Sequence, residues 1–135
     1  MSYLLDVNIL VAWGWSDHVD HERTVDWIAE TKRLGQEQLF TSPIPEIGFT
    51  RVSVQRSHGR IRVQEASEVL QGMLKTLGKS HRFLADDVSG TDWPNWCDSA
   101  GKTTDAHLAK LAEQHDLRLA TLDAGIPNAF LLPNL

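Results

Sequence analysis

Short apolar runs alternate with longer helical patterns along this 135-residue chain, and the alternation limits the folds open to it. Each apolar run is only a few residues long and is bounded by polar or turn residues, which is typical of a buried strand. The segments between the runs carry apolar residues at helical spacing. This pattern predicts an α/β fold, with a mainly parallel central sheet and helices on both faces. We expect strands at 3–5, 39–41, 82–85, 117–121 and 129–132, and helices at 7–13, 20–33, 43–56, 63–77 and 104–115.

Length and composition indicate one domain spanning residues 1–135, because the chain shows no repeat, low-complexity tract or linker. No apolar stretch approaches the roughly 18 residues of a membrane span, and the start lacks the features of a signal peptide. The lone cysteine, Cys97, excludes an internal disulfide and a cysteine-rich zinc site. We therefore expect a cytoplasmic protein without membrane association.

Two aspartates stand at the ends of predicted strands. Asp6 follows the apolar run YLL, and Asp123 ends the segment RLATLD. Burying an unpaired carboxylate costs several kcal/mol, so Asp6 needs either an exit to solvent or a cation. In a parallel sheet the carboxyl ends of the strands share one edge, where ligands bind. We expect Asp6 and Asp123 to converge at that edge.

Two further acids lie at predicted helix starts, Glu46 in SPIPEIGFTRV and Asp105 in GKTTDAHLAKLA, where Thr103 or Thr104 is the expected cap. Helix starts follow strand ends in this architecture, so all four acids can meet above the sheet. Each acid alone has an ordinary interpretation as a helix cap, a dipole partner or a turn residue. Together, four repelling carboxylates would destabilise the fold unless a cation held them. Oxygen-only ligands favour Mg²⁺ or Mn²⁺.

The segments LLDVNILVAW, PIPEIGFTRV, TTDAHLAKLA and ATLDAGI, in this order, resemble the four signatures of PIN-domain ribonucleases. The resemblance is closest to the VapC-type toxins of toxin–antitoxin modules, and it covers essentially the whole chain. It implies a three-layer PIN-like fold and a metal-dependent endoribonuclease. It places the acidic cluster on Asp6, Glu46, Asp105 and Asp123, with Asn8 and Thr121 as supporting polar groups. ATLDAGI lacks a second acid that some relatives carry, which leaves one or two metal ions open.

The expected chemistry is hydrolysis of an RNA phosphodiester by water that the ion activates. Asp6 and Asp105 are the expected principal ligands, and Asp123 completes the site directly or through water. Glu46 ligates a second ion or orients the attacking water. Asn8 supports these ligands by hydrogen bonding.

The net charge of −5 argues mildly against a nonspecific nucleic-acid coat, but one stretch, RVSVQRSHGRIR, is locally basic. This band is a weak candidate for RNA binding, and a solvated helix face explains it about as well. Its arginines are Arg51, Arg56, Arg60 and Arg62. The family resemblance further implies an antitoxin partner and a homodimer. A carboxylate cluster is also a natural receptor for an antitoxin arginine.

Other interpretations stay open. A receiver-type signalling domain shares the sheet and a bound Mg²⁺, but it needs a lysine after a late strand, and none stands near ATLDAGI. A PIN-like scaffold without activity is the second alternative, and the presence of all four acids argues against it. A zinc site at His18, His21 and Glu22 has no partner motif. His107 is expected at a surface or interface.

Overall fold

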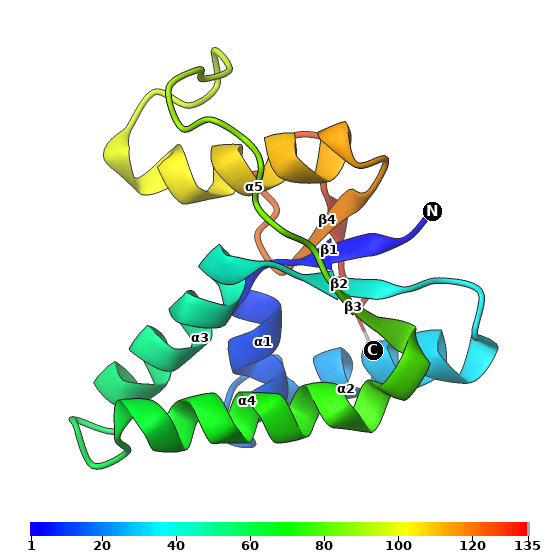
Figure 1. The fold of residues 1–135 in the computed structure, drawn as a ribbon, viewed down its shortest axis with the longest axis vertical. Coiled ribbons are helices and arrows are strands. Elements are labelled where there is room, and N and C mark those ends of the chain that lie inside the picture. Colours follow the sequence, from blue (N-terminus) through cyan, green and yellow to red (C-terminus); the bar gives the residue numbers. More distant parts are fainter. Residues whose placement is uncertain (135) are drawn as a thin grey trace.

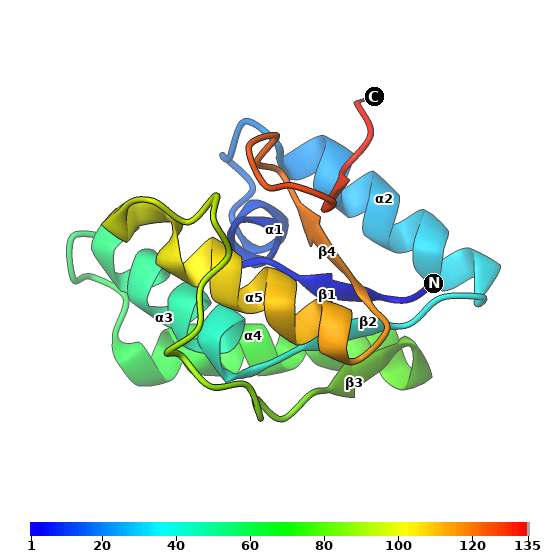
Figure 2. The same ribbon diagram turned by 90° about the horizontal axis from the view of Figure 1, so that it is seen from above.

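A computed structural model describes residues 1–134, which form three layers: one helix, a sheet, and four helices on the opposite face (Figure 1). Viewed from above, α5 crosses the sheet on the near side, and α1 to α4 lie behind or beside it (Figure 2). The strands are β1 (Tyr3–Leu5), β2 (Leu39–Thr41), β3 (His81–Phe83), β4 (Arg118–Thr121) and β5 (Phe130–Leu131). The helices are α1 (Val7–Gly14), α2 (His21–Leu34), α3 (Pro43–Arg56), α4 (Val63–Leu77) and α5 (Thr103–Gln114), with 3₁₀ turns η1 (Gly78–Ser80) and η2 (Ala100–Lys102).

The five strands form one parallel sheet in the order β3-β2-β1-β4-β5. This confirms the predicted α/β class and its helices on both faces. β1 lies at the centre, with Leu4 beside Phe40 of β2 and Leu5 beside Ala120 of β4. Because all strands run the same way, the residues that follow β1, β2 and β4 gather at one edge.

Alternation along β1 divides the core into two clusters. Leu5 packs with α1 to α4 in the larger cluster, whereas Leu4 packs with Leu108 and Leu111 of α5 in the smaller one. Successive side chains of a strand point to opposite faces, so Asp6 continues the alternation on the α5 side. The strand therefore directs this carboxylate toward the start of α5.

Most predicted boundaries agree with the structure within one residue, and α3 and α4 match at both ends. The predicted strand at 82–85 begins earlier, at His81, because pairing with β2 starts beside Leu39. The predicted Thr cap of α5 was wrong. Lys102 is the N-cap, since η2 leads directly into the helix and the Thr103 hydroxyl donates to the Ala100 carbonyl at 2.8 Å. None of the described helices combines the length and apolar character needed to cross a membrane.

Candidate active site

Asp6 is the most buried acid of the strand edge, with 4% of its surface exposed. It is the N-cap of α1, and its Oδ1 accepts a hydrogen bond from the Val7 N–H at 2.7 Å. Its Oδ2 accepts from the Thr121 hydroxyl at 2.8 Å. Burial raises the pKa of Asp6 to about 6, against the lowering effect of these two hydrogen bonds. The Asp105 and Asp123 carboxylates raise the pKa further, so the three aspartates lie close enough to repel one another.

Asp105 and Asp123 approach Asp6 from two different elements. Asp105 lies in the first turn of α5, and its pKa is raised by burial and by the charge of Asp123. Asp123 is exposed just after β4, and its Oδ1 accepts from the Gly125 N–H at 2.8 Å. The ordinary interpretations of Asp6 as a cap and Asp123 as a turn residue are thus correct. They do not account for the convergence of the three charges.

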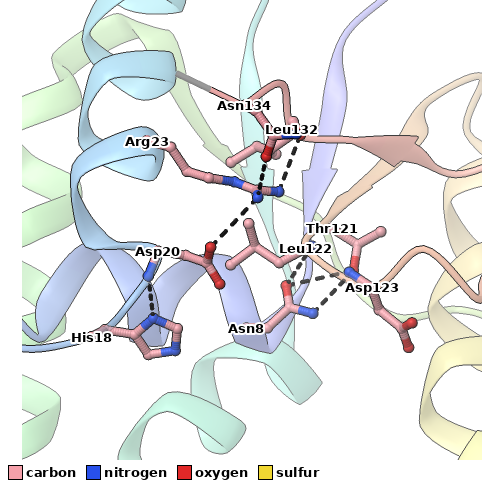
Figure 3. A network of polar contacts seen from close by, with 9 residues as sticks. All are labelled: Asn8, His18, Asp20, Arg23, Thr121, Leu122, Asp123, Leu132 and Asn134. Atoms are coloured by element: carbon pink, nitrogen blue, oxygen red, sulfur yellow. Dashed lines mark hydrogen bonds and ion pairs between the residues drawn. The ribbon is translucent and has the colours of Figure 1, made fainter.

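Asn8 and Thr121 join α1 to the end of β4 beside Asp123 (Figure 3). The Asn8 side-chain amide donates to the Thr121 hydroxyl at 3.0 Å, and its carbonyl oxygen accepts from the Leu122 N–H at 3.1 Å. The Thr121 hydroxyl also accepts from the Asp123 N–H at 3.1 Å while it donates to Asp6. These contacts fix the spacing between Asp6 and the backbone of Asp123. Thr121 contacts the Asp6 carboxylate directly, whereas Asn8, which was expected to hydrogen-bond the ligands, reaches Asp6 only through Thr121 among the described residues.

Glu46 lies in the first turn of α3, and its neighbours differ from those of the three aspartates. Its Oε2 accepts a hydrogen bond from the buried Thr41 hydroxyl at 2.7 Å, and the same hydroxyl lies 2.7 Å from Nε2 of His81. Burial lowers the pKa of His81, and the Glu46 charge partly opposes that shift. Glu46 is not among the groups that shift the pKa of Asp6 or Asp105. The structure therefore brings together three of the four predicted acids and holds the fourth at the neighbouring strand end.

The donor chemistry of the edge fits a hard divalent cation. All the acids offer oxygen ligands, and no Lys or Arg among residues 1–134 forms an ion pair with any of the four. The fully buried Ser42 hydroxyl has no hydrogen-bond partner among residues 1–134, and continuing the β1–β2 register places Ser42 beside Asp6. Such an orphaned group costs about 1 to 3 kcal/mol, which a hydrated ion next to Asp6 would offset. Across residues 1–134, no three His, Cys, Asp or Glu side chains lie close enough together to hold a metal ion, so the three aspartates approach one another without forming a complete ligand set in this structure.

The arginines of the basic band differ in whether other side chains already engage them. The Arg56 guanidinium pairs with Asp17 at 2.9 Å and lies over the Trp15 ring, 4.8 Å from its centroid. Arg51, Arg60 and Arg62 are exposed. Because α3 runs away from the strand edge, the band extends outward from Glu46 (Figure 1).

Two histidine predictions have clear outcomes. His107 was expected at a surface or interface, away from the acids. It does lie apart from them, but its Nε2 is 2.6 Å from Asp86, and only 11% and 14% of the two side chains are exposed. Residues 84–99 fold back over that side of α5 and cover the ring, which the sequence does not reveal (Figure 2). His18 accepts from the Asp20 N–H, and a His21 ring nitrogen contacts the Ala12 carbonyl. Both rings therefore have structural partners.

Comparisons with known proteins agree with this geometry. The PIN domain family model matches residues 3–129. Ribonuclease VapC38 of Mycobacterium tuberculosis is 40% identical over 91% of this chain and 86% of its own length. Ribonuclease VapC39 of the same organism is 34% identical over 96% of this chain and 94% of its own length. A crystal structure of VapBC2 from Rickettsia felis bound to a promoter DNA fragment contains a chain with the same fold, at a TM-score of 0.61, 15% identity and 97% coverage of both chains. This chain therefore belongs to the PIN domain family, among its VapC-type members.

Proposed function

We propose that this protein is an endoribonuclease that depends on Mg²⁺ or Mn²⁺ and acts as the toxin of a toxin–antitoxin pair. The observation that carries the proposal is the convergence of Asp6, Asp105 and Asp123 at the strand edge, where no Lys or Arg of residues 1–134 pairs with them. Relatives named as ribonucleases, matched over most of the chain, support the same activity.

Each residue of the edge has a defined part in this proposal. Asp6 and Asp105 are the principal ligands of the ion, and Asp123 completes the site directly or through water. When bound, a divalent ion neutralises phosphate charge and lowers the pKa of water. Asn8 and Thr121 hold Asp6 and the Asp123 backbone in place. Their hydrogen bonds restrict the carboxylates before any substrate arrives.

The RNA backbone would lie across the start of α3 and follow the exposed arginines of the basic band. Arg51, Arg60 and Arg62 are available to neutralise phosphates. Arg56 is the weakest member of the band because Asp17 and Trp15 already engage its guanidinium. Replacing Arg51, Arg60 and Arg62 should raise KM for RNA more than it lowers kcat.

The partners of this function are a cognate antitoxin and a second copy of the chain, acting in the cytoplasm. A group of unpaired carboxylates is a strong receptor for a guanidinium, so an antitoxin arginine placed there would displace the ion. Co-purification with the antitoxin and a sedimentation measurement of the isolated protein test the two assemblies.

The decisive experiment is incubation of the antitoxin-free protein with a mixed cellular RNA pool and Mg²⁺ or Mn²⁺. Discrete products are expected, and they should disappear with EDTA and with Asp6→Asn. Asp92→Asn is a matched control, because Asp92 is exposed and already paired with Lys110. Intact RNA with folded protein would contradict the proposal and favour a PIN-like binding scaffold.

A further inference from the structure

The hydrogen bonds around Glu46 have a fixed direction. Thr41 is fully buried and its hydroxyl carries a single proton. An ionised Glu46 carboxylate only accepts, so the Thr41 proton is donated to Oε2. The Thr41 oxygen must then accept from His81, which requires the hydrogen of the His81 ring to be on Nε2. The chain of donors therefore runs from His81 through Thr41 to Glu46.

This chain of donors lies on the opposite face of the sheet from Asp6. Leu39 packs in the larger cluster with α1 to α4, and Thr41, two residues later, points to the same face. His81 is the register partner of Leu39, so its ring lies on that face as well. Asp6 points to the α5 side. The hydrogen-bonded chain that ends at Glu46 and the group around Asp6 therefore approach the strand edge from opposite sides of the sheet.

One oxygen of Glu46 is thus occupied and the other is free. Oε2 receives the Thr41 proton, and no residue among 1–134 hydrogen-bonds Oε1. A long acidic side chain loses rotamer entropy when it is fixed, and the Thr41 contact supplies that restriction in advance. A proton donor on Oε2 also competes with a metal ion for the same lone pairs.

We propose that Thr41 and His81 are positioning residues that hold Glu46 apart from the three aspartates, so that its free oxygen orients water instead of ligating their ion. This inference rests on the proposed nuclease function, and it separates the two roles that the sequence left open for Glu46. Neither Thr41 nor His81 touches the substrate in this account.

Binding of Mn²⁺, measured by calorimetry on the full chain, tests the assignment without any RNA. Glu46→Gln and Thr41→Val should change the Mn²⁺ dissociation constant by less than about twofold, whereas loss of a true ligand costs about 10-fold or more. In cleavage assays on the same RNA pool, Thr41→Val should lower kcat by about 10-fold with KM little changed. Thr41→Ser, which keeps the hydroxyl, and His81→Gln, which keeps a donor, should recover most of kcat.

Thr24→Val is the matched control, because Thr24 is equally buried and its hydroxyl has no hydrogen-bond partner in the described part of the chain. It should leave kcat and Mn²⁺ affinity unchanged. Nitrogen NMR of the histidine rings provides a second readout that needs neither metal nor RNA. His81 should show its hydrogen on Nε2, and Thr41→Val should shift that resonance.

The outcomes separate the two proposals. A tenfold loss of Mn²⁺ affinity in Glu46→Gln or Thr41→Val would overturn the positioning inference, as would a His81 hydrogen on Nδ1. A loss of kcat in Thr41→Val that Thr41→Ser does not recover would overturn it too. RNA left intact by the wild-type protein, with Mn²⁺ bound and the expected His81 signal present, would instead contradict the nuclease function.

Discussion

Two acidic regions of this protein lie beside the same helix and differ in how their charges are balanced. In the segment 84–99 every acid has a basic partner from η2 or from α5 and its C-cap. The nitrogen–oxygen distances are 2.6 Å for Asp86 with His107, 2.9 Å for Asp87 with His115, 3.2 Å for Asp92 with Lys110, and 2.9 Å for Asp98 with Lys102. At the strand edge, Asp6, Asp105 and Asp123 converge, and no Lys or Arg of residues 1–134 pairs with them.

The difference shows that the chain does not lack cations near α5; it places them away from the strand edge. The paired acids hold the segment 84–99 against α5, and basic side chains already balance their charges. At the strand edge, neighbouring carboxylates raise the pKa of Asp6 and of Asp105, which is unfavourable energy that a divalent cation can release. Perturbed carboxylates in such a position are characteristic of functional sites. The ion pairs give the segment 84–99 a structural role, and the strand edge is the site that we propose to be catalytic.

The largest expected effect is on RNA cleavage, and it comes from removing one negative charge at the strand edge. Asp6→Asn should lower RNA cleavage by about 1,000-fold, or about 4 kcal/mol, because it removes a principal ligand of the ion. Asp92→Asn, in the paired region, should leave cleavage unchanged. Single-turnover cleavage with both variants measures this contrast, and equal activity of the two would remove the distinction between the regions.

The pH dependence of stability should carry the signature of Asp6. Its pKa is 3.8 in the unfolded reference and about 6 in the folded protein, so the folded state binds the proton more tightly. Between these values the folded protein holds more protons, and its free energy of unfolding falls as pH rises, by at most about 3 kcal/mol. Denaturant unfolding in EDTA from pH 4 to 8 should show this decline in the wild type and a flatter profile in Asp6→Asn. Parallel profiles would show that Asp6 is not destabilised by burial.

Breaking the most buried pair of the other region should affect folding and spare metal binding. His107→Ala leaves Asp86 mostly buried without its partner, and we expect a loss of about 2 kcal/mol in the free energy of unfolding. Chemical denaturation measures the loss, and calorimetry should find the Mn²⁺ affinity of the folded variant unchanged. A weakened Mn²⁺ affinity would mean that the two regions are coupled through α5.

The smallest effect is expected at the exposed pair of Lys102 and Asp98, where 48% and 70% of the side chains are accessible. Solvent and salt screen such a pair almost completely. Lys102→Gln should leave the midpoint of thermal unfolding unchanged at physiological salt. A clear decrease would indicate that the start of α5 depends on this contact.

The sequence predicted the sheet and the helices, because periodicity is a local pattern. Asp6 and Asp123 were expected at one edge from the rule for parallel strands, and Asp105 was expected there because helix starts follow strand ends. The sequence could not predict which neighbour each acid meets. His81 was missed because its contact with Thr41 depends on the pairing of β2 with β3, 40 residues apart.

The partner of His107 was unpredictable for a similar reason. Its spacing from Asp105 correctly separated it from the acids, but the partner, Asp86, comes from an irregular segment without periodicity. The sequence also could not show that the Arg56 guanidinium is engaged by Trp15 and Asp17, because these are tertiary contacts. Local sequence patterns predict the helices, the strands and the sheet edge at which the strands end. The contacts between side chains of different elements can be identified only once the fold is known.

The most direct test of the contrast between the two regions is Mn²⁺ binding to the wild-type protein, Asp6→Asn and Asp92→Asn, measured by calorimetry at one pH and salt concentration. We expect Asp6→Asn to abolish the binding seen in the wild type and Asp92→Asn to retain it. Undiminished binding by Asp6→Asn would show that the aspartates of the strand edge do not form the cation site.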